Sequence, residues 1–198
     1  MNINGNNYAQ FTGFILILVF FSTAIAYAIS FILTKNNIVV PFYIEIPSIT
    51  AIYAFFFTLF DKYFWKFPIF KKIGIIVADD LNGKWQGIIK SSHDNFLSDI
   101  KAELNINQTA TNIKVHGIFD QSRSVSIHES FGKSEVDDRT ALFYFYRNEP
   151  QYDATETMVI HEGSVKLIYN GKDELSGYYY SGRDRNHYGT ISVKKVYS

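Results

Sequence analysis

Ile100-Lys-Ala-Glu-Leu-Asn-Ile-Asn107 alternates apolar and polar side chains without interruption. A period of two is typical of a β-strand that buries one face and exposes the other. The same alternation returns in Ile113-Lys-Val-His-Gly117 and in Val165-Lys-Leu-Ile-Tyr169, and turn-forming residues such as Asn170-Gly-Lys-Asp173 stand between these runs. Because no stretch after Asp79 shows a helical period, this part of the sequence predicts an all-β domain.

The alternating runs of this domain fit eight strands. An up-and-down barrel that closes by antiparallel pairing of its first and last strands needs an even number, so 148–162 is expected to be a long connection, although 155–160 could form a ninth strand. A barrel of eight strands can be filled by side chains or can hold one small ligand. The expected strands are 83–91, 99–108, 112–120, 123–130, 140–147, 163–170, 175–181 and 188–196.

Gly83-Lys84-Trp85 stands at the start of the first expected strand. It resembles the Gly-x-Trp opening of lipocalin-like barrels, in which the tryptophan plugs the closed end. We therefore expect Trp85 to be a structural plug in the core rather than a ligand contact, since aromatic side chains dominate protein cores.

The first sixty residues differ sharply from this domain in composition. They contain only two charged side chains, Lys35 and Glu45, and residues 11–33 contain none. A helix of about twenty apolar residues crosses a bilayer core of about 30 Å. Residues 11–33 are therefore expected to span a membrane.

A second apolar run is expected to form a second transmembrane helix at about 39–60. Pro41 and Pro47 would then lie near its start, where a missing N–H is tolerated. Because Thr34 to Asn37 allow only a tight link, the sequence predicts a transmembrane hairpin over 11–60.

The lysines after this hairpin predict its orientation. By the positive-inside rule, both termini and the barrel face the cytoplasm. This gives a cytoplasmic N-terminus at 1–10, a basic juxtamembrane linker at 61–77 and a cytoplasmic barrel at 78–198. The lysines that set the orientation are Lys62, Lys66, Lys71 and Lys72.

A cleaved signal peptide is the alternative for the first apolar run, because Ala24-Ile-Ala26 is similar to a cleavage site. Residues 1–10 lack Lys and Arg, the run is long and a second run follows, all of which favour a retained span. The chain contains no cysteine, which excludes a disulfide framework.

Four of the five arginines lie at or beside the connections of one end of the expected barrel. In up-and-down order the connections 92–98, 121–122, 148–162 and 182–187 share the end farther from the membrane. The connections 109–111, 131–139 and 171–174 share the other end. The four arginines at the far end are Arg123, Arg147, Arg183 and Arg185.

Strand parity indicates which side chains point inward. The positions expected to face inward are odd-numbered: Trp85, Val115, Phe119, Val125, Ile127, Phe143, Phe145, Tyr179, Ile191 and Val193. Continued to the rim, the same parity directs Arg123, Arg147, Arg183 and His187 toward the mouth.

Arginine suits bidentate phosphate recognition and stacking on bases. Tyr146, Tyr152, Tyr179 and Tyr180 add aromatic faces nearby. We therefore expect an anionic, aromatic ligand at the mouth. The expected ligand contacts are Arg123, Tyr146, Arg147, Tyr179, Arg183, Arg185 and His187.

The alternative is a solvated rim, because Asp120, Glu149, Asp153 and Asp184 occur in the same connections. Residues 61–198 carry equal numbers of basic and acidic residues, which argues against DNA or RNA as a partner. No metal-ligand spacing, phosphate loop or nucleophile elbow occurs, so we expect neither a metal site, nor a cofactor, nor catalysis.

The order of these parts resembles the two-helix β-barrel effectors of bacterial CBASS anti-phage systems. The likeness covers essentially the whole chain: two apolar helices, a basic juxtamembrane step and a barrel that opens with Gly83-Lys84-Trp85. The closing hairpin, from Leu175 through Arg183 to Ile191, is also similar to that group.

This resemblance implies an inner-membrane effector whose barrel binds a cyclic dinucleotide made by a partner cyclic-nucleotide synthase. Ligand-bound barrels would then associate into oligomers, cluster the hairpins and disrupt the lipid bilayer. Small residues such as Ser22, Ala24 and Ala26 are of the kind that permits close helix packing in lipid. Two other functions stay open: a tethered lipocalin-like carrier of an apolar ligand, and an interaction module for a protein partner.

Overall fold

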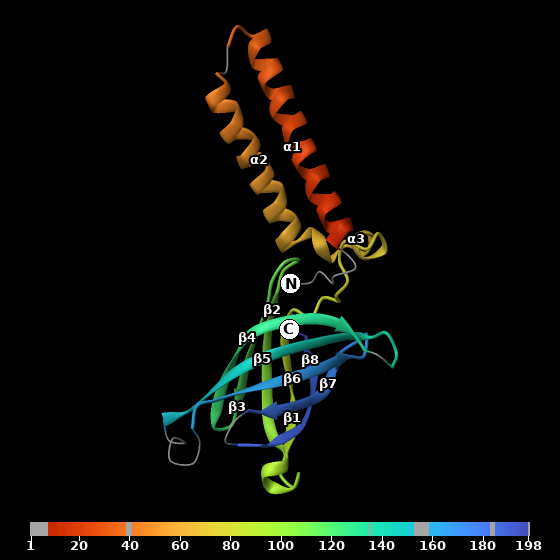
Figure 1. Ribbon diagram of the computed structural model, residues 1–198, viewed down its shortest axis with the longest axis vertical. Coiled ribbons are helices and arrows are strands. Elements are labelled where there is room, and N and C mark those ends of the chain that lie inside the picture. Colours follow the sequence, from red (N-terminus) through yellow and green to blue (C-terminus); the bar gives the residue numbers. More distant parts are fainter. Residues whose placement is uncertain (1–7, 39–40, 135, 153–158, 183–184, 198) are drawn as a thin grey trace. The chain divides into compact units, whose positions relative to one another are not determined.

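The chain forms two compact units that divide between Val77 and Ala78, shown in Figure 1. The computed structural model describes residues 8–38, 41–134, 136–152, 159–182 and 185–197.

The first unit contains two long apolar helices, α1 (Tyr8–Lys35) and α2 (Phe42–Lys62). Aromatic side chains join them: the ring centroids of Phe14 and Phe60 are 4.3 Å apart, and those of Phe21 and Phe56 are 5.5 Å apart. Ser22 and Ala26, one turn apart on α1, are buried. A short 3-10 turn, η2 (Phe64–Lys66), and a short helix, α3 (Pro68–Lys72), follow α2.

One helix among the described residues is long and apolar enough to cross a membrane, from Ala9 to Lys35. This agrees with the expected first span and extends it at both ends. The second helix forms where the second span is expected, with Pro41 at its N-cap and Pro47 inside its first turns. Because only α1 is long and apolar enough to cross a membrane among the described residues, a two-span hairpin is not shown by the structure.

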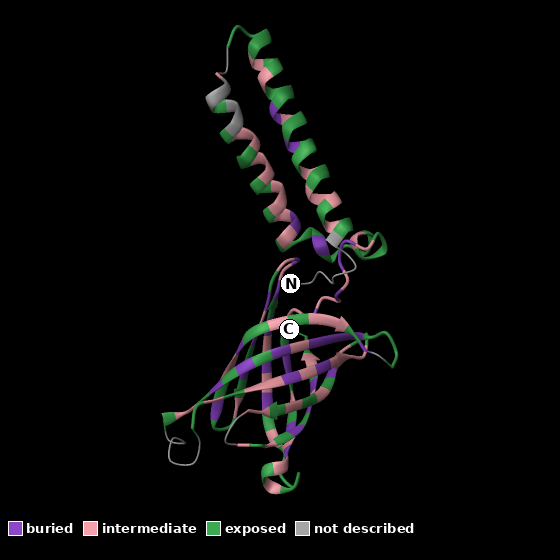
Figure 2. Cartoon of the chain, in the orientation of Figure 1, coloured by how far each residue is buried: buried purple, intermediate pink, exposed green. Residues whose placement is uncertain are grey.

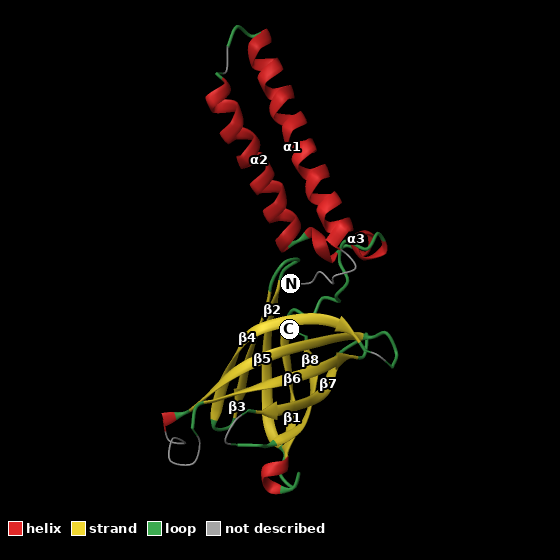
Figure 3. Cartoon of the chain, viewed as in Figure 1, coloured by secondary structure: helices red, strands yellow, loops and turns green. Residues whose placement is uncertain are grey.

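The second unit is a closed barrel of eight antiparallel strands, drawn in yellow in Figure 3. Each strand pairs with the next, and β1 closes against β8 with Trp85 opposite Lys195. This confirms the predicted eight-stranded barrel. Of the stretch considered as a ninth strand, 155–158 lie outside the described residues, and Val159 and Ile160 are not in a strand. The strands are β1 (Gly83–Ser91), β2 (Ile100–Gln108), β3 (Ile113–Phe119), β4 (Ser122–Lys133), β5 (Thr140–Pro150), β6 (His161–Tyr169), β7 (Glu174–Ser181) and β8 (Tyr188–Val196).

Large apolar side chains fill the end of the barrel where β1 begins, which we call the closed end. Trp85 is completely buried there, and its indole Nε1–H donates to the carbonyl of Leu81 at 2.9 Å. The N–H of Leu81 in turn donates to Gln108 Oε1 at 2.7 Å. The ring of Tyr169 packs edge-on against that of Trp85, with the ring centroids 6.0 Å apart. Other buried members of this core are Leu104, Ile106, Ile113, Val115, Leu142, Leu167, Leu175 and Val193.

Strand register determines which residues face the interior, because paired residues share one face of the sheet. Buried and exposed residues accordingly alternate along the strands in Figure 2. Gly117 of β3 pairs with Ser124 of β4, which places even-numbered β4 residues inside. Ser126 pairs with Tyr146, so even-numbered residues of β5 also face inward.

The expectation that odd-numbered positions face inward is therefore wrong for β5 and for the first half of β4. Phe145 is 59% exposed and Ile127 is 52% exposed. The physical reason is the two-residue link between β3 and β4, which exchanges odd for even positions, followed by a bulge that leaves Ile127 without a paired residue. Arg123 and Arg147 accordingly lie exposed on the outer face of the barrel.

Candidate ligand-binding site

The barrel contains a cavity of about 480 Å³ at the end opposite Trp85. This end, which we call the mouth, is formed by the connections that follow β1, β3, β5 and β7. The lining residues are Ile89, Ser91, His93, Asp94, Ser98, Ile100, Phe119, Asp120, Gln121, Ser122, Ser124, Tyr144, Tyr146, Asn148, His161, Val165, Tyr179, Ser181, Arg185, His187 and Ile191.

The cavity exists because small polar side chains take inward positions that large apolar ones fill at the closed end. Ser91, Ser122, Ser124 and Ser181 line it from three different parts of the barrel wall. A serine hydroxyl can both donate and accept a hydrogen bond. This half of the barrel is therefore hollow and can satisfy polar groups of a ligand.

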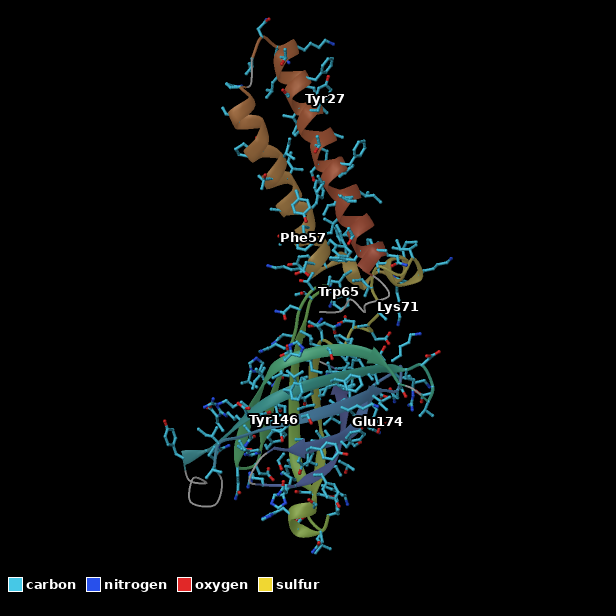
Figure 4. The ribbon with its side chains drawn as sticks, viewed as in Figure 1. Tyr27, Phe57, Trp65, Lys71, Tyr146 and Glu174 are labelled. Atoms are coloured by element: carbon cyan, nitrogen blue, oxygen red, sulfur yellow. The ribbon has the colours of Figure 1, made fainter. Side chains whose placement is uncertain are left out.

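Three tyrosines supply rings to the cavity: Tyr144 and Tyr146 from β5, and Tyr179 from β7. Tyr146 is labelled in Figure 4. Glycines admit two of these rings, because a Cβ added at Gly163 would lie 2.5 Å from the Tyr146 hydroxyl, and one added at Gly189 would lie 2.5 Å from Tyr179 Cε1. Burial raises the pKa of all three phenols. They therefore stay neutral, with rings for stacking and hydroxyls for hydrogen bonding.

Basic and imidazole side chains meet at the mouth. Arg185 Nη1 lies 3.2 Å from His161 Nδ1, and the rings of His93 and His187 are 4.9 Å apart. Ser181 fixes the backbone of His187, because the Ser181 Oγ accepts a hydrogen bond from the His187 N–H at 3.1 Å and donates one to the His187 carbonyl at 2.9 Å.

His161 and His187 are held in their neutral form. Burial, with the neighbouring charges of Arg185 and His187, lowers the pKa of His161. Burial, His93 and Arg185 lower the pKa of His187. Both imidazoles are therefore neutral near pH 7 when no ligand is bound.

Two carboxylates also line the cavity, Asp94 and Asp120. Asp94 Oδ2 accepts from the N–H of Ser98 at 2.8 Å, and hydrogen bonds from Ser98 lower the pKa of the Asp94 carboxyl. Its Oδ1 is buried and has no hydrogen-bond partner among the described residues. Asp94 is therefore an ionised acceptor at the edge of the cavity.

The structure brings four of the residues expected at the site into this cavity: Tyr146, Tyr179, Arg185 and His187. Arg123 and Arg147 do not line it, and Arg147 instead contacts Glu149 with Nε 3.4 Å from the carboxylate. Arg183 lies outside the described residues. Tyr152 and Tyr180 are exposed, at 101% and 52%.

Sequence reasoning missed Tyr144, His93 and His161. Tyr144, like Tyr146, is at an even-numbered position of β5. The expectation that odd-numbered positions of this strand face inward therefore directed it outward. His161 occurs in a stretch expected to be a connection, although it opens β6. His93 carried no signal, because it lies in a 3-10 turn, η3 (Ser92–Asp94), that no periodicity marks.

A second hollow, of about 210 Å³, lies on the outer face of the barrel, where it is lined by outward-facing residues such as Phe143, Phe145 and Tyr180. It is smaller than the mouth cavity, and no arginine among the described residues lines it. Among the residues that the structure describes, no group of three or more His, Cys, Asp or Glu side chains is arranged to hold a metal ion. The mouth cavity is therefore the stronger candidate for ligand binding.

A comparison with known families gives one match. The family model described as Cap15, cyclic dinucleotide receptor domain, matches residues 77–195, which is more than half of the chain. The matched range contains the whole lining of the mouth cavity. No curated protein matches the chain.

Proposed function

Because the chain belongs to the family of Cap15 cyclic dinucleotide receptor domains, we propose that its barrel binds a cyclic dinucleotide in the mouth cavity and acts as a CBASS effector. The family agrees with the resemblance to CBASS effectors that the sequence suggested. It is a family of receptor domains, which supports recognition of a ligand rather than catalysis.

One observation carries this proposal: Arg185 and the three tyrosine rings share a single cavity of about 480 Å³. Small-molecule sites typically measure about 300–1,000 Å³. The planar guanidinium of Arg185 suits a phosphate oxygen pair, and Tyr144, Tyr146 and Tyr179 offer faces on which bases can stack. A cyclic dinucleotide needs both kinds of contact.

The first test is a thermal shift of a fragment spanning 78–198 against cyclic di-AMP, cyclic di-GMP and cyclic GMP–AMP. A ligand at a hundred times its dissociation constant should stabilise the fragment by about 2.7 kcal/mol. The fragment is expected to be soluble and rich in β-structure, because the closed barrel satisfies its own backbone hydrogen bonds. A well-folded fragment whose melting temperature none of these compounds raises would argue against the function.

Arg185→Ala is expected to weaken cyclic dinucleotide binding by about ten- to a hundredfold, because a hydrogen bond to a charged group contributes roughly 1.5–3 kcal/mol. Lysine at this position should restore only part of the affinity, since it lacks the planar fork. Isothermal titration calorimetry measures both dissociation constants.

Two arginines serve as matched controls for this substitution. Arg147→Ala removes a guanidinium from the outer face, and Arg139→Ala removes one that pairs with Asp137 in the turn between β4 and β5. Both variants should bind like the unaltered protein. An equal loss at Arg147 and Arg185 would place the ligand outside the mouth cavity.

We further propose that α1 anchors the protein in the bacterial inner membrane and that α2 crosses it a second time. The positive-inside rule, applied to Lys62, Lys66, Lys71 and Lys72 in the 61–77 linker, supports a cytoplasmic barrel and cytoplasmic termini. The length and apolar composition of α1 support the anchor.

In this proposal a partner synthase supplies the cyclic dinucleotide, and ligand-bound chains associate into oligomers. Their helices then cluster and disrupt the bilayer. The exposed Ala24 and Ala28, one turn apart on α1, support this step, because small residues on one face of a helix allow close approach of a second helix in lipid.

A further inference from the structure

We propose that His93, His161 and His187 form, together with Arg185, the phosphate-binding part of the mouth cavity, and that His161 and His187 take up protons when an anionic ligand enters. This proposal rests on the function proposed above and names the source of positive charge in the site. It also makes binding tighter in mildly acidic solution.

The three histidines converge on the cavity from separate parts of the chain. His93 comes from η3, His161 opens β6, and His187 lies in the connection from β7 to β8 beside Arg185. Contacts of 3.2 Å between Arg185 Nη1 and His161 Nδ1, and of 4.9 Å between the rings of His93 and His187, join them in pairs. All four side chains line the cavity.

The remaining two histidines of the chain lie elsewhere. His116 in β3 and His128 in β4 are exposed, and neither lines the mouth cavity. The chain has five histidines in all, so more than half of them meet at this one site.

The charges of the cavity require an additional positive source. Among the described lining residues, Arg185 alone carries a permanent positive charge, whereas Asp94 and Asp120 are carboxylates. A cyclic dinucleotide brings two phosphodiester anions. With His161 and His187 neutral, the two carboxylates outnumber Arg185 and oppose such a ligand, since like charges repel each other. Protonation of His161 and His187 makes the summed charge of the lining residues positive.

The groups that face each imidazole determine the sign of the pH dependence. His161 faces Arg185 and the ring of Tyr146. His187 faces His93 and Arg185. The carboxylate next to His93 in the sequence is Asp94. Without a ligand, burial and Arg185 lower the pKa of His161 and of His187, so both are neutral. A phosphate beside the ring favours the charged form and raises its pKa.

Binding therefore takes up protons between the pKa of the free site and the higher pKa of the occupied site. Affinity increases as the pH falls through this interval and becomes constant below it. Each proton taken up changes the dissociation constant by up to about tenfold per pH unit, because one unit corresponds to about 1.4 kcal/mol.

The test uses the full-length chain in detergent micelles and isothermal titration calorimetry with cyclic di-AMP, cyclic di-GMP and cyclic GMP–AMP. Each titration is repeated between about pH 6 and about pH 8, the range in which histidine changes charge. Two buffers with different ionisation enthalpies at each pH give the number of protons taken up directly. The expected result is net proton uptake, with a dissociation constant at least about tenfold lower at the acidic end.

The triple variant His93→Gln, His161→Gln and His187→Gln should lose the proton uptake and bind with nearly the same affinity at both ends of the range. The matched control is His116→Gln with His128→Gln, which should keep the pH dependence of the unaltered protein. The proton count on the unaltered chain tests the idea without relying on the folding of any variant.

Three outcomes would overturn the inference. Binding without proton uptake, or an unchanged pH dependence in the triple variant, would remove the histidines from the phosphate contacts while the proposed function stands. Absence of binding to every compound at every pH would contradict the proposed function itself.

Discussion

Replacing Trp85 with alanine is expected to lower the free energy of unfolding of the barrel by about 3–5 kcal/mol, because truncation of a buried aromatic side chain leaves a cavity that the surroundings fill only in part. Trp85 is completely buried at the closed end. Its indole N–H also donates to the carbonyl of Leu81, which would lose this partner. Since the total free energy of unfolding of a small domain is about 5–15 kcal/mol, a large fraction of the molecules would be unfolded at physiological temperature. Urea denaturation followed by circular dichroism measures the change.

Tyr180→Ala is the matched control for this substitution. Tyr180 is an aromatic residue of the same barrel, but it is 52% exposed and faces outward. Its truncation should change the free energy of unfolding by less than about 1 kcal/mol, as is usual for surface positions. A Trp85→Ala variant that melts normally and yet fails to bind cyclic dinucleotides would show that Trp85 belongs to the ligand site instead of the core.

Exchanging residues 1–60 for an unrelated single-span anchor is expected to abolish ligand-dependent membrane leakage while cyclic dinucleotide binding is retained. The cavity is built entirely from residues of the barrel, so its geometry does not depend on the exchanged segment. The proposed damage, in contrast, comes from clustered helices, whose packing requires the specific surfaces of α1 and α2. Dye uptake by cells supplied with the ligand measures leakage, and calorimetry on the purified chain measures binding.

Two measurements control this exchange. The altered chain must sediment with the membrane fraction at the level of the unaltered one, and the unaltered chain must cause no leakage without a cyclic dinucleotide. Leakage that persists after the exchange would transfer the disruptive role to the barrel or to the linker that follows Asp61.

The fold of the barrel was predictable from sequence because its signals are local. Runs such as Ile100 to Asn107 alternate with the period of a strand, and Trp85 opens the first of them. An even number of such runs then favours a closed barrel, which the structure has. The long apolar stretch of α1 is likewise recognisable from composition alone.

The site was predictable only in part, because its composition depends on register between strands. Tyr179 and His187 follow the parity read from the sequence, and both line the cavity. Arg147 does not, because the two-residue link before Ser122 turns even-numbered residues of β4 inward, and the pairing of Ser126 with Tyr146 carries this even parity to β5. Neither feature leaves a mark in the alternation of residues.

What the sequence determined by itself, then, was an eight-stranded barrel with a tryptophan at its closed end and arginines near its mouth, preceded by a helix long and apolar enough to cross a membrane. Only the tertiary structure decided that Arg185, and neither Arg123 nor Arg147, enters the cavity, and that it meets His161 across 24 residues of chain. The physical reason is the separation along the chain between the residues that produce each feature. Periodicity and hydrophobicity arise from neighbours along the chain, whereas closure of the barrel and the pairing of its strands place side chains according to partners that are distant in sequence.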